Sequence, residues 1–360
     1  MFAALLLLAL FALALVVAEL LRFHLWFGRS TNGSAYFGLP SAGRRAFSEE
    51  MRRRARFPAA VWGFLCKLPF AKPPSPPRRA GIGAPPHCDR AGFDRAMSYP
   101  GVEGDVFVVT QMKCGTTWML QLAYEVALRG HGDLSDEGQR HIHAVCPWIE
   151  SVWAVPMEDA PRLGDRRLRI IKSHMPVQLL PVRPQARYLV VTRHPVPCFG
   201  SCVDFIGMLA GPVAGTRADM LDWFCSTRMW WGPWPDHVEG WWRASRRHSN
   251  VLFVHFEEMT ADLPGVVDRV ARFLDVELTP AERDEVIRKS RFDYMKEHEE
   301  RFSMSPPSLF APDGEFLKKG TKRKDTDEGG SEREHIVAYC RERLRAGEYA
   351  KDCFYPDLGS

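Results

Sequence analysis

Residues 105–118 read DVFVVTQMKCGTTW, an apolar run followed by a loop that contains one glycine. The run at 105–110 has the length and the valine-rich composition of a buried parallel strand. An apolar helical pattern continues from the loop to about residue 128. A strand, a glycine loop and a helix in this order predict an anion-binding site, because the free N–H groups at the start of the helix point at the ligand.

Four residues of the loop fit this chemistry. Gly115 lets the backbone approach an anion closely, Thr116 and Thr117 carry hydroxyl donors, and Lys113 adds a point charge. The loop is not a Walker A motif, since its lysine precedes the glycine. The alternative interpretation is an ordinary strand-to-helix turn in which a threonine caps the helix.

Three further apolar runs, at 168–172, 187–192 and 251–256, predict additional strands. Strands that alternate with helical segments favour parallel pairing. The sequence therefore predicts an α/β fold with a central parallel sheet flanked by helices, preceded by a single N-terminal transmembrane helix.

Polar residues follow two of these strands, at the end where open α/β sheets build their sites. Lys172 ends one strand and His174 lies just beyond it, and a histidine there can accept a proton near neutral pH. Arg193 follows the next strand and Ser201 lies eight residues later, a pair that suits a phosphate. Taken alone, the histidine has a structural alternative as a hydrogen-bonded loop residue, and the arginine as an ordinary ion-pair residue.

The N-terminal part differs from the rest in composition. Residues 2–18 contain no polar side chain, so 1–21 is predicted to be an uncleaved membrane anchor, with a secretory signal peptide as the alternative. Residues 22–98 are interpreted as a basic, Pro-rich linker and 99–360 as the catalytic domain. The net charge is +4, yet twelve Lys and Arg against three Glu lie in 1–79, which leaves the remainder acidic.

This charge distribution bears on location and partners. The basic run at 52–56 favours contact with anionic lipid head groups, and the acidic catalytic part argues against a nucleic-acid partner. The positive-inside rule places the catalytic domain in the cytosol. A glycosylation sequon at Asn32 would act only in a lumen, so a Golgi-lumen orientation stays open.

Composition excludes other classes of protein and site. Hydrophobic residues make up 46% and charged residues 26%, which excludes a disordered or collagen-like chain. The nine cysteines are odd in number and scattered, which predicts reduced thiols. No Cys and His set has zinc spacing and no acidic cluster suits Mg²⁺, so no metal is predicted.

Taken together, the motifs resemble the cytosolic-type sulfotransferase family, whose donor is 3′-phosphoadenosine-5′-phosphosulfate (PAPS). The loop at 113–118 is similar to the family's KSGTTW phosphosulfate loop, and KSHMP at 172–176 to its KTHLP catalytic segment. Arg193 and Ser201 match its 3′-phosphate pair with the same spacing. Further matches, in order along about residues 99–320, are GPWPDHVEGWW at 232–242, SRF at 290–292 and KKG at 318–320.

The resemblance implies a role for each matching residue. The catalytic residues are implied to be His174, Lys113 and Lys172. The donor-binding residues are implied to be Lys113, Cys114, Gly115, Thr116, Thr117, Trp118, Arg193, Ser201, Phe256, Ser290, Phe292, Lys318, Lys319 and Gly320. The sequence departs from the family at 111–112, Cys114, Phe256 and the lid after Gly320. The family's dimer signature is absent, so no oligomeric state is predicted.

These roles predict in-line transfer of a sulfuryl group to the hydroxyl or amine of a small apolar or phenolic acceptor. His174 would act as the general base, and Lys113 and Lys172 would neutralise charge on the transferring group. The acceptor pocket is expected in the loops within 133–163 and 206–234. Their aromatic side chains predict an apolar pocket, lined by Trp148, Trp153, Phe205, Trp230 and Trp231.

Three other functions stay open at this point. A Golgi-lumen carbohydrate or protein sulfotransferase would carry a similar anchor, although such members typically have Arg in place of Lys113. An ATP-dependent small-molecule kinase would need Mg²⁺. A non-catalytic membrane adaptor would keep the fold alone, and the intact set of Lys113, His174, Arg193 and Ser201 argues against it.

Overall fold

The computed structural model describes residues 2–31, 36–66, 78–134, 141–153, 155–303, 317 and 330–359. A four-stranded sheet lies at its centre, in the order β4-β3-β5-β6, and every pair of neighbouring strands in it is parallel. The strands are β3 (Asp105–Thr110), β4 (Arg169–Ser173), β5 (Arg187–Thr192) and β6 (Val251–His255). The predicted α/β fold with a central parallel sheet is therefore confirmed.

Two strands differ slightly from their predicted ranges. Strand β4 is shifted by one residue, and β6 ends one residue before Phe256. Helix α9 (Phe256–Ala261) begins there because His255 and Glu258 form a capping box around its first turn.

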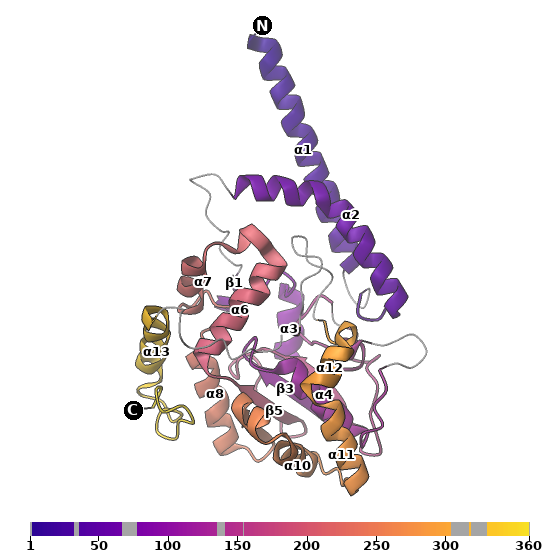
Figure 1. Cartoon of the computed structure of the whole chain (residues 1–360), viewed down its shortest axis with the longest axis vertical. Coiled ribbons are helices and arrows are strands. Elements are labelled where there is room, and N and C mark those ends of the chain that lie inside the picture. Colours follow the sequence, from indigo (N-terminus) through magenta and orange to yellow (C-terminus); the bar gives the residue numbers. More distant parts are fainter. Residues whose placement is uncertain are drawn as a thin grey trace.

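The sheet is buried on both faces. In β3 the side chains of Phe107 and Val109 belong to one core cluster, and those of Val106 and Val108 belong to the other. The first face is covered by α3 (Arg90–Ser98), α6 (Pro195–Ala210), α8 (Trp234–Arg247) and α13 (Gly330–Leu344), and the second by α4 (Thr116–Ala127), α10 (Leu263–Phe273) and α11 (Pro280–Lys289) (Figure 1). This arrangement explains why the strands are continuous apolar runs.

Shorter elements complete the described chain. They are β1 (Arg78–Arg79), β2 (Ile82–Gly83), α5 (Ile142–Val145), α7 (Arg217–Phe224), α12 (Phe292–Glu297) and the 3₁₀ helices η2 (Gly211–Ala214) and η3 (Glu299–Arg301). Strands β1 and β2 pair antiparallel.

The N-terminal part is more structured than a linker. Helix α1 (Phe2–Thr31) continues past the predicted anchor boundary at residue 21, and α2 (Ser41–Leu65) lies within the predicted linker 22–98. By length and composition, Leu5–Arg29 is apolar enough to cross a membrane. Figure 1 shows α1 projecting away from the body of the protein. The Pro-rich stretch at 71–77 and Asn32 lie outside the described residues.

The core of the domain also begins before residue 99, where the sequence placed its start. Phe93 and Ala96 of α3, three residues apart on one helical face, are buried in the first core cluster together with Cys88. Asp89 caps this helix by accepting a hydrogen bond from the Gly92 N–H at 2.8 Å. The segment before β3 is thus part of the folded domain.

Candidate active site

The loop between β3 and α4 has the backbone of an anion site. Lys113 has a φ of 62° and Gly115 a φ of 101°, both in the left-handed region. A Cβ at Gly115 would lie 2.8 Å from the Phe256 ring, so glycine is needed for both conformation and space. Among the described residues, no side chain caps the start of α4. The threonine cap of the alternative interpretation is therefore absent, and the first N–H groups of α4 are open to a ligand.

Two lysines supply positive charge beside this loop. The Lys172 side chain is fully buried, and its Nζ lies 3.5 Å from the centre of the Trp148 ring. Burial lowers the pKa of Lys172 to about 7, although nearby Glu150 opposes the shift. Burial likewise lowers the pKa of Lys113 to about 8, and its Nζ lies 4.5 Å from the Phe205 ring centre. Both cations lack the solvation of a surface lysine, so an anionic ligand would stabilise their charged forms.

His174 is held in one orientation and one tautomer. Its Nδ1 lies 2.8 Å from the carbonyl oxygen of Thr110, which can only accept a hydrogen bond, so Nδ1 carries the proton. Nε2 is then the basic nitrogen. The main-chain N–H of His174 donates to the Glu150 carboxylate at 2.6 Å. Burial, followed by the charge of Lys172, holds the His174 pKa well below its usual range, so the ring is neutral at pH 7.

A second group of predicted residues meets on the other side of the loop. The Arg193 guanidinium lies 4.6 Å from the centre of the Phe256 ring and donates to the Lys113 carbonyl oxygen at 3.4 Å. Trp118 packs edge-on against Phe256, with ring centres 5.4 Å apart, and its Nε1 donates to the Ser290 carbonyl oxygen at 2.6 Å. Five residues from four segments of the chain therefore converge.

The remaining predicted donor-binding residues differ in how far they are buried and in whether the structure describes them. Ser201 lies half-buried in the first half of α6, and Phe292 is the first residue of α12 and is also half-buried. The Cys114 side chain is buried and faces the core, where its Sγ lies 3.7 Å from that of Cys198. The loop turns this thiol inward, so the predicted contact between Cys114 and a donor would have to be made by its main chain. Lys318, Lys319 and Gly320 lie outside the described residues.

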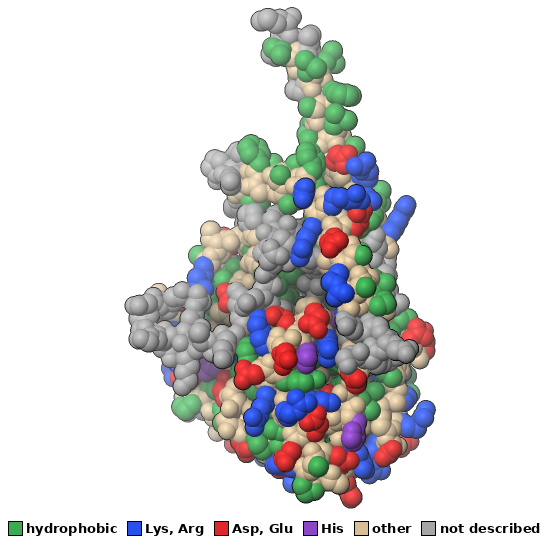
Figure 2. All heavy atoms as spheres, turned by 45° about the vertical axis from the view of Figure 1, so that its right-hand side comes forward, with side chains coloured by type: hydrophobic (Ala, Val, Ile, Leu, Met, Phe, Trp, Pro, Cys, Tyr) green, Lys and Arg blue, Asp and Glu red, His purple; other side chains and the backbone are tan. Residues whose placement is uncertain are grey.

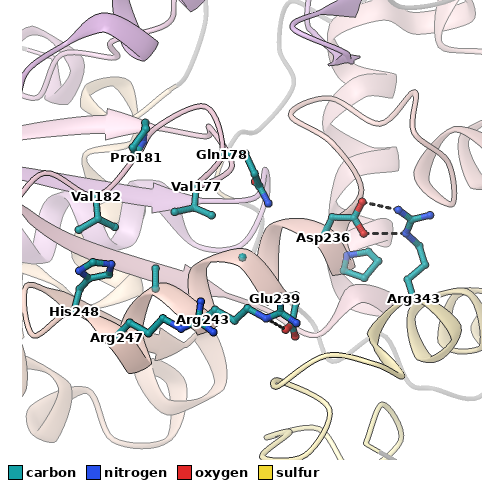
Figure 3. Close-up of a pocket in the computed structure, with 13 residues that line it drawn as sticks. Val177, Gln178, Pro181, Val182, Asp236, Glu239, Arg243, Arg247, His248 and Arg343 are labelled. Atoms are coloured by element: carbon teal, nitrogen blue, oxygen red, sulfur yellow. Dashed lines mark hydrogen bonds and ion pairs between the residues drawn. The ribbon is translucent and has the colours of Figure 1, made fainter.

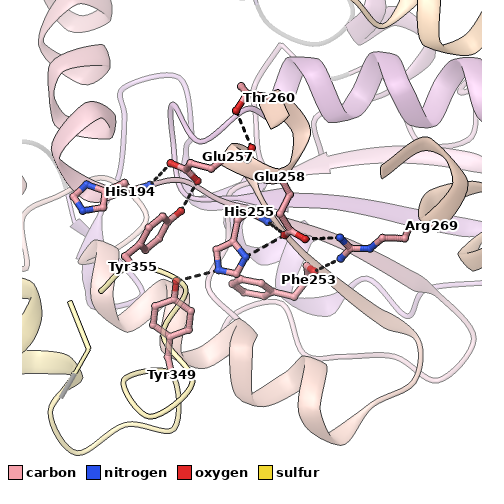
Figure 4. A network of polar contacts seen from close by, with 9 residues as sticks. All are labelled: His194, Phe253, His255, Glu257, Glu258, Thr260, Arg269, Tyr349 and Tyr355. Carbon is pink, nitrogen blue, oxygen red and sulfur yellow. Dashed lines mark hydrogen bonds and ion pairs between the residues drawn. The ribbon is translucent and has the colours of Figure 1, made fainter. Parts of the chain in front are cut away.

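A polar network secures the loop that carries Arg193 (Figure 4). Glu257 accepts hydrogen bonds from the His194 main-chain N–H at 3.2 Å and from the Tyr355 hydroxyl at 2.7 Å. His255 Nε2 lies 3.1 Å from the Tyr349 hydroxyl. The segment after α13 therefore ties together the carboxyl ends of β5 and β6.

Two residues near His174, Glu150 and His87, belong to no motif of the sequence. Glu150 is fully buried and positions the main chain at His174, as described above. His87 lies far away in sequence, yet its ring centre is 4.9 Å from that of Trp148. Trp231, by contrast, was expected in the acceptor pocket, and its ring centre lies 4.5 Å from that of His174. An isolated acid after Trp148 was a usable signal for Glu150, whereas nothing in the sequence pointed to His87.

A surface pocket of about 620 Å³ lies elsewhere, between α8 and residues 177–182 (Figure 3). None of the predicted site residues lines it. Its arginines are paired, since Arg343 binds Asp236 at 2.6 Å and Arg243 binds Glu239 at 2.5 Å. Across the described part of the chain, no cluster of His, Cys, Asp and Glu is arranged to hold a metal ion.

Comparisons with known proteins agree with this geometry. The family model for the sulfotransferase domain matches residues 103–335. Cytosolic sulfotransferase 1 of Danio rerio is 26% identical over 235 residues, which cover 63% of this chain and 78% of the relative. Human sulfotransferase 2B1 is 30% identical over 229 residues, which cover 61% of this chain and 60% of the relative.

Solved structures show the same fold. A mouse sulfotransferase complexed with PAP aligns with a TM-score of 0.55 and 21% identity, covering 75% of this chain and 94% of that one. Retinol dehydratase in complex with retinol and PAP aligns with a TM-score of 0.56 and 19% identity, covering 74% and 88%. The anion loop, the two lysines and the positioned histidine lie within the matched region. This chain belongs to the sulfotransferase domain family and is a sulfotransferase, with PAPS as its expected co-substrate.

Proposed function

We propose that the enzyme transfers the sulfuryl group of PAPS to a hydroxyl or amine of a small, apolar acceptor, with His174 as the general base. The observation that carries this assignment is the hydrogen bond from His174 Nδ1 to the Thr110 carbonyl oxygen, 2.8 Å long. It leaves Nε2 free to take the acceptor proton. The new bond forms between the acceptor atom and sulfur, the sulfur bond to the 5′-phosphate oxygen breaks, and PAP leaves.

On the donor side, the proposal assigns charge stabilisation to Lys113 and Lys172. Both have lowered pKa values in the free protein, so binding of an anion would favour their protonated forms. Gly115, Thr116 and Thr117 would hold the 5′-phosphate through the open N–H groups of α4 and the threonine hydroxyls.

The 3′-phosphate and the adenine would lie near the convergence of Arg193 and Phe256. Arg193 and Ser201 would bind the 3′-phosphate, together with Lys318, Lys319 and Gly320. Trp118, Phe256, Ser290 and Phe292 would contact the adenine. The Trp118–Ser290 hydrogen bond and the Arg193–Phe256 contact support this placement, because they bring these segments together beside the anion loop.

On the acceptor side, aromatic rings surround His174. The Trp148 and Trp231 ring centres lie 5.3 and 4.5 Å from that of the histidine. Such walls favour an apolar or phenolic alcohol over a sugar. Retinol dehydratase has been solved with retinol and with androsterone, both apolar molecules, and the likeness supports the same class of acceptor here.

We further propose that α1 is a single-pass membrane anchor with the catalytic domain in the cytosol. The apolar side chains of α1 are exposed, and the basic residues follow it in the sequence. The Asn32 sequon favours the alternative, in which the domain lies in the Golgi lumen and acts on carbohydrate or protein. A mobility shift on endoglycosidase treatment of the expressed full chain would favour that lumenal orientation.

Turnover by the full chain with labelled PAPS and an acceptor panel tests the function. His174→Ala should abolish most of the transfer, whereas His248→Ala, at an exposed position after α8, should leave it unchanged. Undiminished turnover by His174→Ala would refute the base assignment, and absence of transfer to every alcohol, phenol and amine would refute the acceptor class.

A further inference from the structure

The two N-terminal helices pack against each other as a hairpin, here called the α1–α2 hairpin (residues 2–31 and 41–65, with Tyr36 and Phe37 between them). The Trp26 ring of α1 stacks on Phe47 of α2, with centres 5.8 Å apart. The Arg54 guanidinium lies 5.0 Å from the centre of the same Trp26 ring. Figure 1 shows α2 beside the lower part of α1, close to the body of the protein.

The connection between the two helices reaches the acceptor side of the domain. Tyr36 and Phe37 are 5% and 1% exposed. The Phe37 ring centre lies 4.7 Å from that of His141, 5.0 Å from that of His143 and 6.3 Å from that of Trp153. Phe37 therefore packs into the 141–153 loop, part of the region in which the acceptor pocket was expected.

From that loop, ring contacts lead to the proposed base. Trp153 stacks on His87 with centres 4.5 Å apart, His87 lies 4.9 Å from Trp148, and Trp148 lies 5.3 Å from His174. Aromatic contacts thus connect the hairpin to His174 without a break.

Several buried polar atoms along this path have no hydrogen-bond partner among the described residues. They include Nε2 of His87, Nε1 of Trp153 and Nε1 of Trp148. Burial lowers the pKa of His87 to about 3, so its ring is neutral. Buried polar atoms normally have partners, because leaving them unpaired costs free energy. A ligand with a polar group on an otherwise apolar body would satisfy them.

The outer surface of the hairpin fits a bilayer surface. Helix α2 contains Pro58, which bends it. The part of the helix after Pro58, here called the arm, runs across α1 (Figure 1). Trp62 and Phe64 on this arm are 45% and 65% exposed, and Phe57, just before Pro58, is 44% exposed. Exposed arginines of the 52–56 run precede it, and Figure 2 shows blue and green side chains together at this level below apolar α1. Exposed aromatics beside basic residues are typical of helices that lie in a membrane interface.

We propose that the α1–α2 hairpin seats the acceptor side of the active site on the membrane, and that the acceptor is an extended, membrane-partitioning alcohol or phenol that enters from the lipid. This inference rests on the proposed sulfuryl transfer and on α1 as an anchor. The hydroxyl end of the acceptor reaches His174, and the distal end contacts Phe37 near His87. Soluble acceptors with a single ring reach His174 without contacting Phe37.

The test uses the full chain in vesicles of phosphatidylcholine and phosphatidylserine, with two probes. Androsterone is extended and partitions into lipid, whereas 4-nitrophenol is short and soluble. Phe37→Leu keeps an apolar side chain but loses the ring contacts, and we expect the KM for androsterone to rise about tenfold, equivalent to about 1.4 kcal/mol. The KM for 4-nitrophenol and the affinity for PAP should stay unchanged. Phe253→Leu, at a buried position on edge strand β6, is the matched control and should change neither KM.

The membrane part is tested by replacing Trp62 and Phe64 together with Ser. Turnover of vesicle-dissolved androsterone should fall, and turnover of 4-nitrophenol should not. Equal changes for both probes, or none, in either variant overturn the proposal. If the wild-type chain transfers sulfate to neither probe nor to any other acceptor of the panel, the proposed function fails instead. In that case, the affinity for androsterone is measured by tryptophan quenching with PAP bound, in the wild type and in Phe37→Leu. An affinity that is the same in both overturns the inference.

Discussion

Binding of PAP should take up protons, because the two lysines that would meet its 5′-phosphate are only partly charged in the free enzyme. The pKa is about 7 for Lys172 and about 8 for Lys113. At pH 8, Lys172 is then about one-tenth protonated and Lys113 about half protonated. If the bound phosphate keeps both charged, binding takes up about 1.4 protons.

The sign follows from the lowered pKa values. Raising the pH deprotonates the free enzyme but not the complex, so PAP affinity must fall as pH rises, by about 25-fold between pH 7.5 and 8.5. Phosphate groups with a second pKa near 6 contribute little in this range. In Lys172→Met only Lys113 remains, so the uptake should drop to about 0.5 protons and the pH effect to about threefold.

Isothermal titration of PAP at pH 8 in buffers of different ionisation enthalpy measures the uptake directly. Lys351→Met, which removes an exposed lysine remote in sequence from the loop, is the control and should behave as the wild type. A PAP affinity that is independent of pH and buffer would refute the reasoning. An uptake that is unchanged in Lys172→Met would refute the assignment of the proton to that side chain.

Three further predictions concern catalysis and stability. His174→Ala should lower single-turnover rates by about 10²–10⁴-fold with PAP affinity unchanged; a parallel loss of affinity would contradict a base role. Gly115→Ala should lower the melting temperature and weaken PAP binding because its φ is 101° and its Cβ would meet a ring at 2.8 Å, whereas Gly207→Ala, with open space in α6, should not. Asp105→Asn should cost about 3–5 kcal/mol in urea unfolding by leaving the buried Arg169, now 2.9 Å away, without a negatively charged partner; a loss under 1 kcal/mol would contradict this.

The sequence predicted the sheet well because β3, β4 and β5 are buried on both faces. Such strands are continuous apolar runs in the sequence, and the length of each run defined the strand ends to within one residue. The site residues at strand ends followed from the parallel topology, which places all carboxyl ends along one edge. The inward turn of Cys114 was not readable, since it depends on the left-handed backbone of its two neighbours, Lys113 and Gly115.

The N-terminal region was the least predictable part, for a physical reason. Helix α2 is rich in Arg, which hides its apolar face in the sequence, and it contains Pro58, which lowers its helix propensity. Met51 and Ala55 are nevertheless buried, and the helix contacts α1 and the distant η2. The position of Phe37 against His141 depends on two chain segments more than 100 residues apart, and no local pattern encodes it.

The charges at the site are coupled in an order that favours catalysis after donor binding. The positive charge of Lys172 is one of the causes that hold the pKa of His174 low. An anion that keeps Lys172 protonated also places negative charge beside it, and this charge offsets the effect of the lysine and makes His174 a stronger base. Without the anion, Lys172 is about half neutral at pH 7, since its pKa is about 7. The same buried lysine thus links occupancy of the donor site to the basicity of His174, although the catalytic domain as a whole carries a net negative charge.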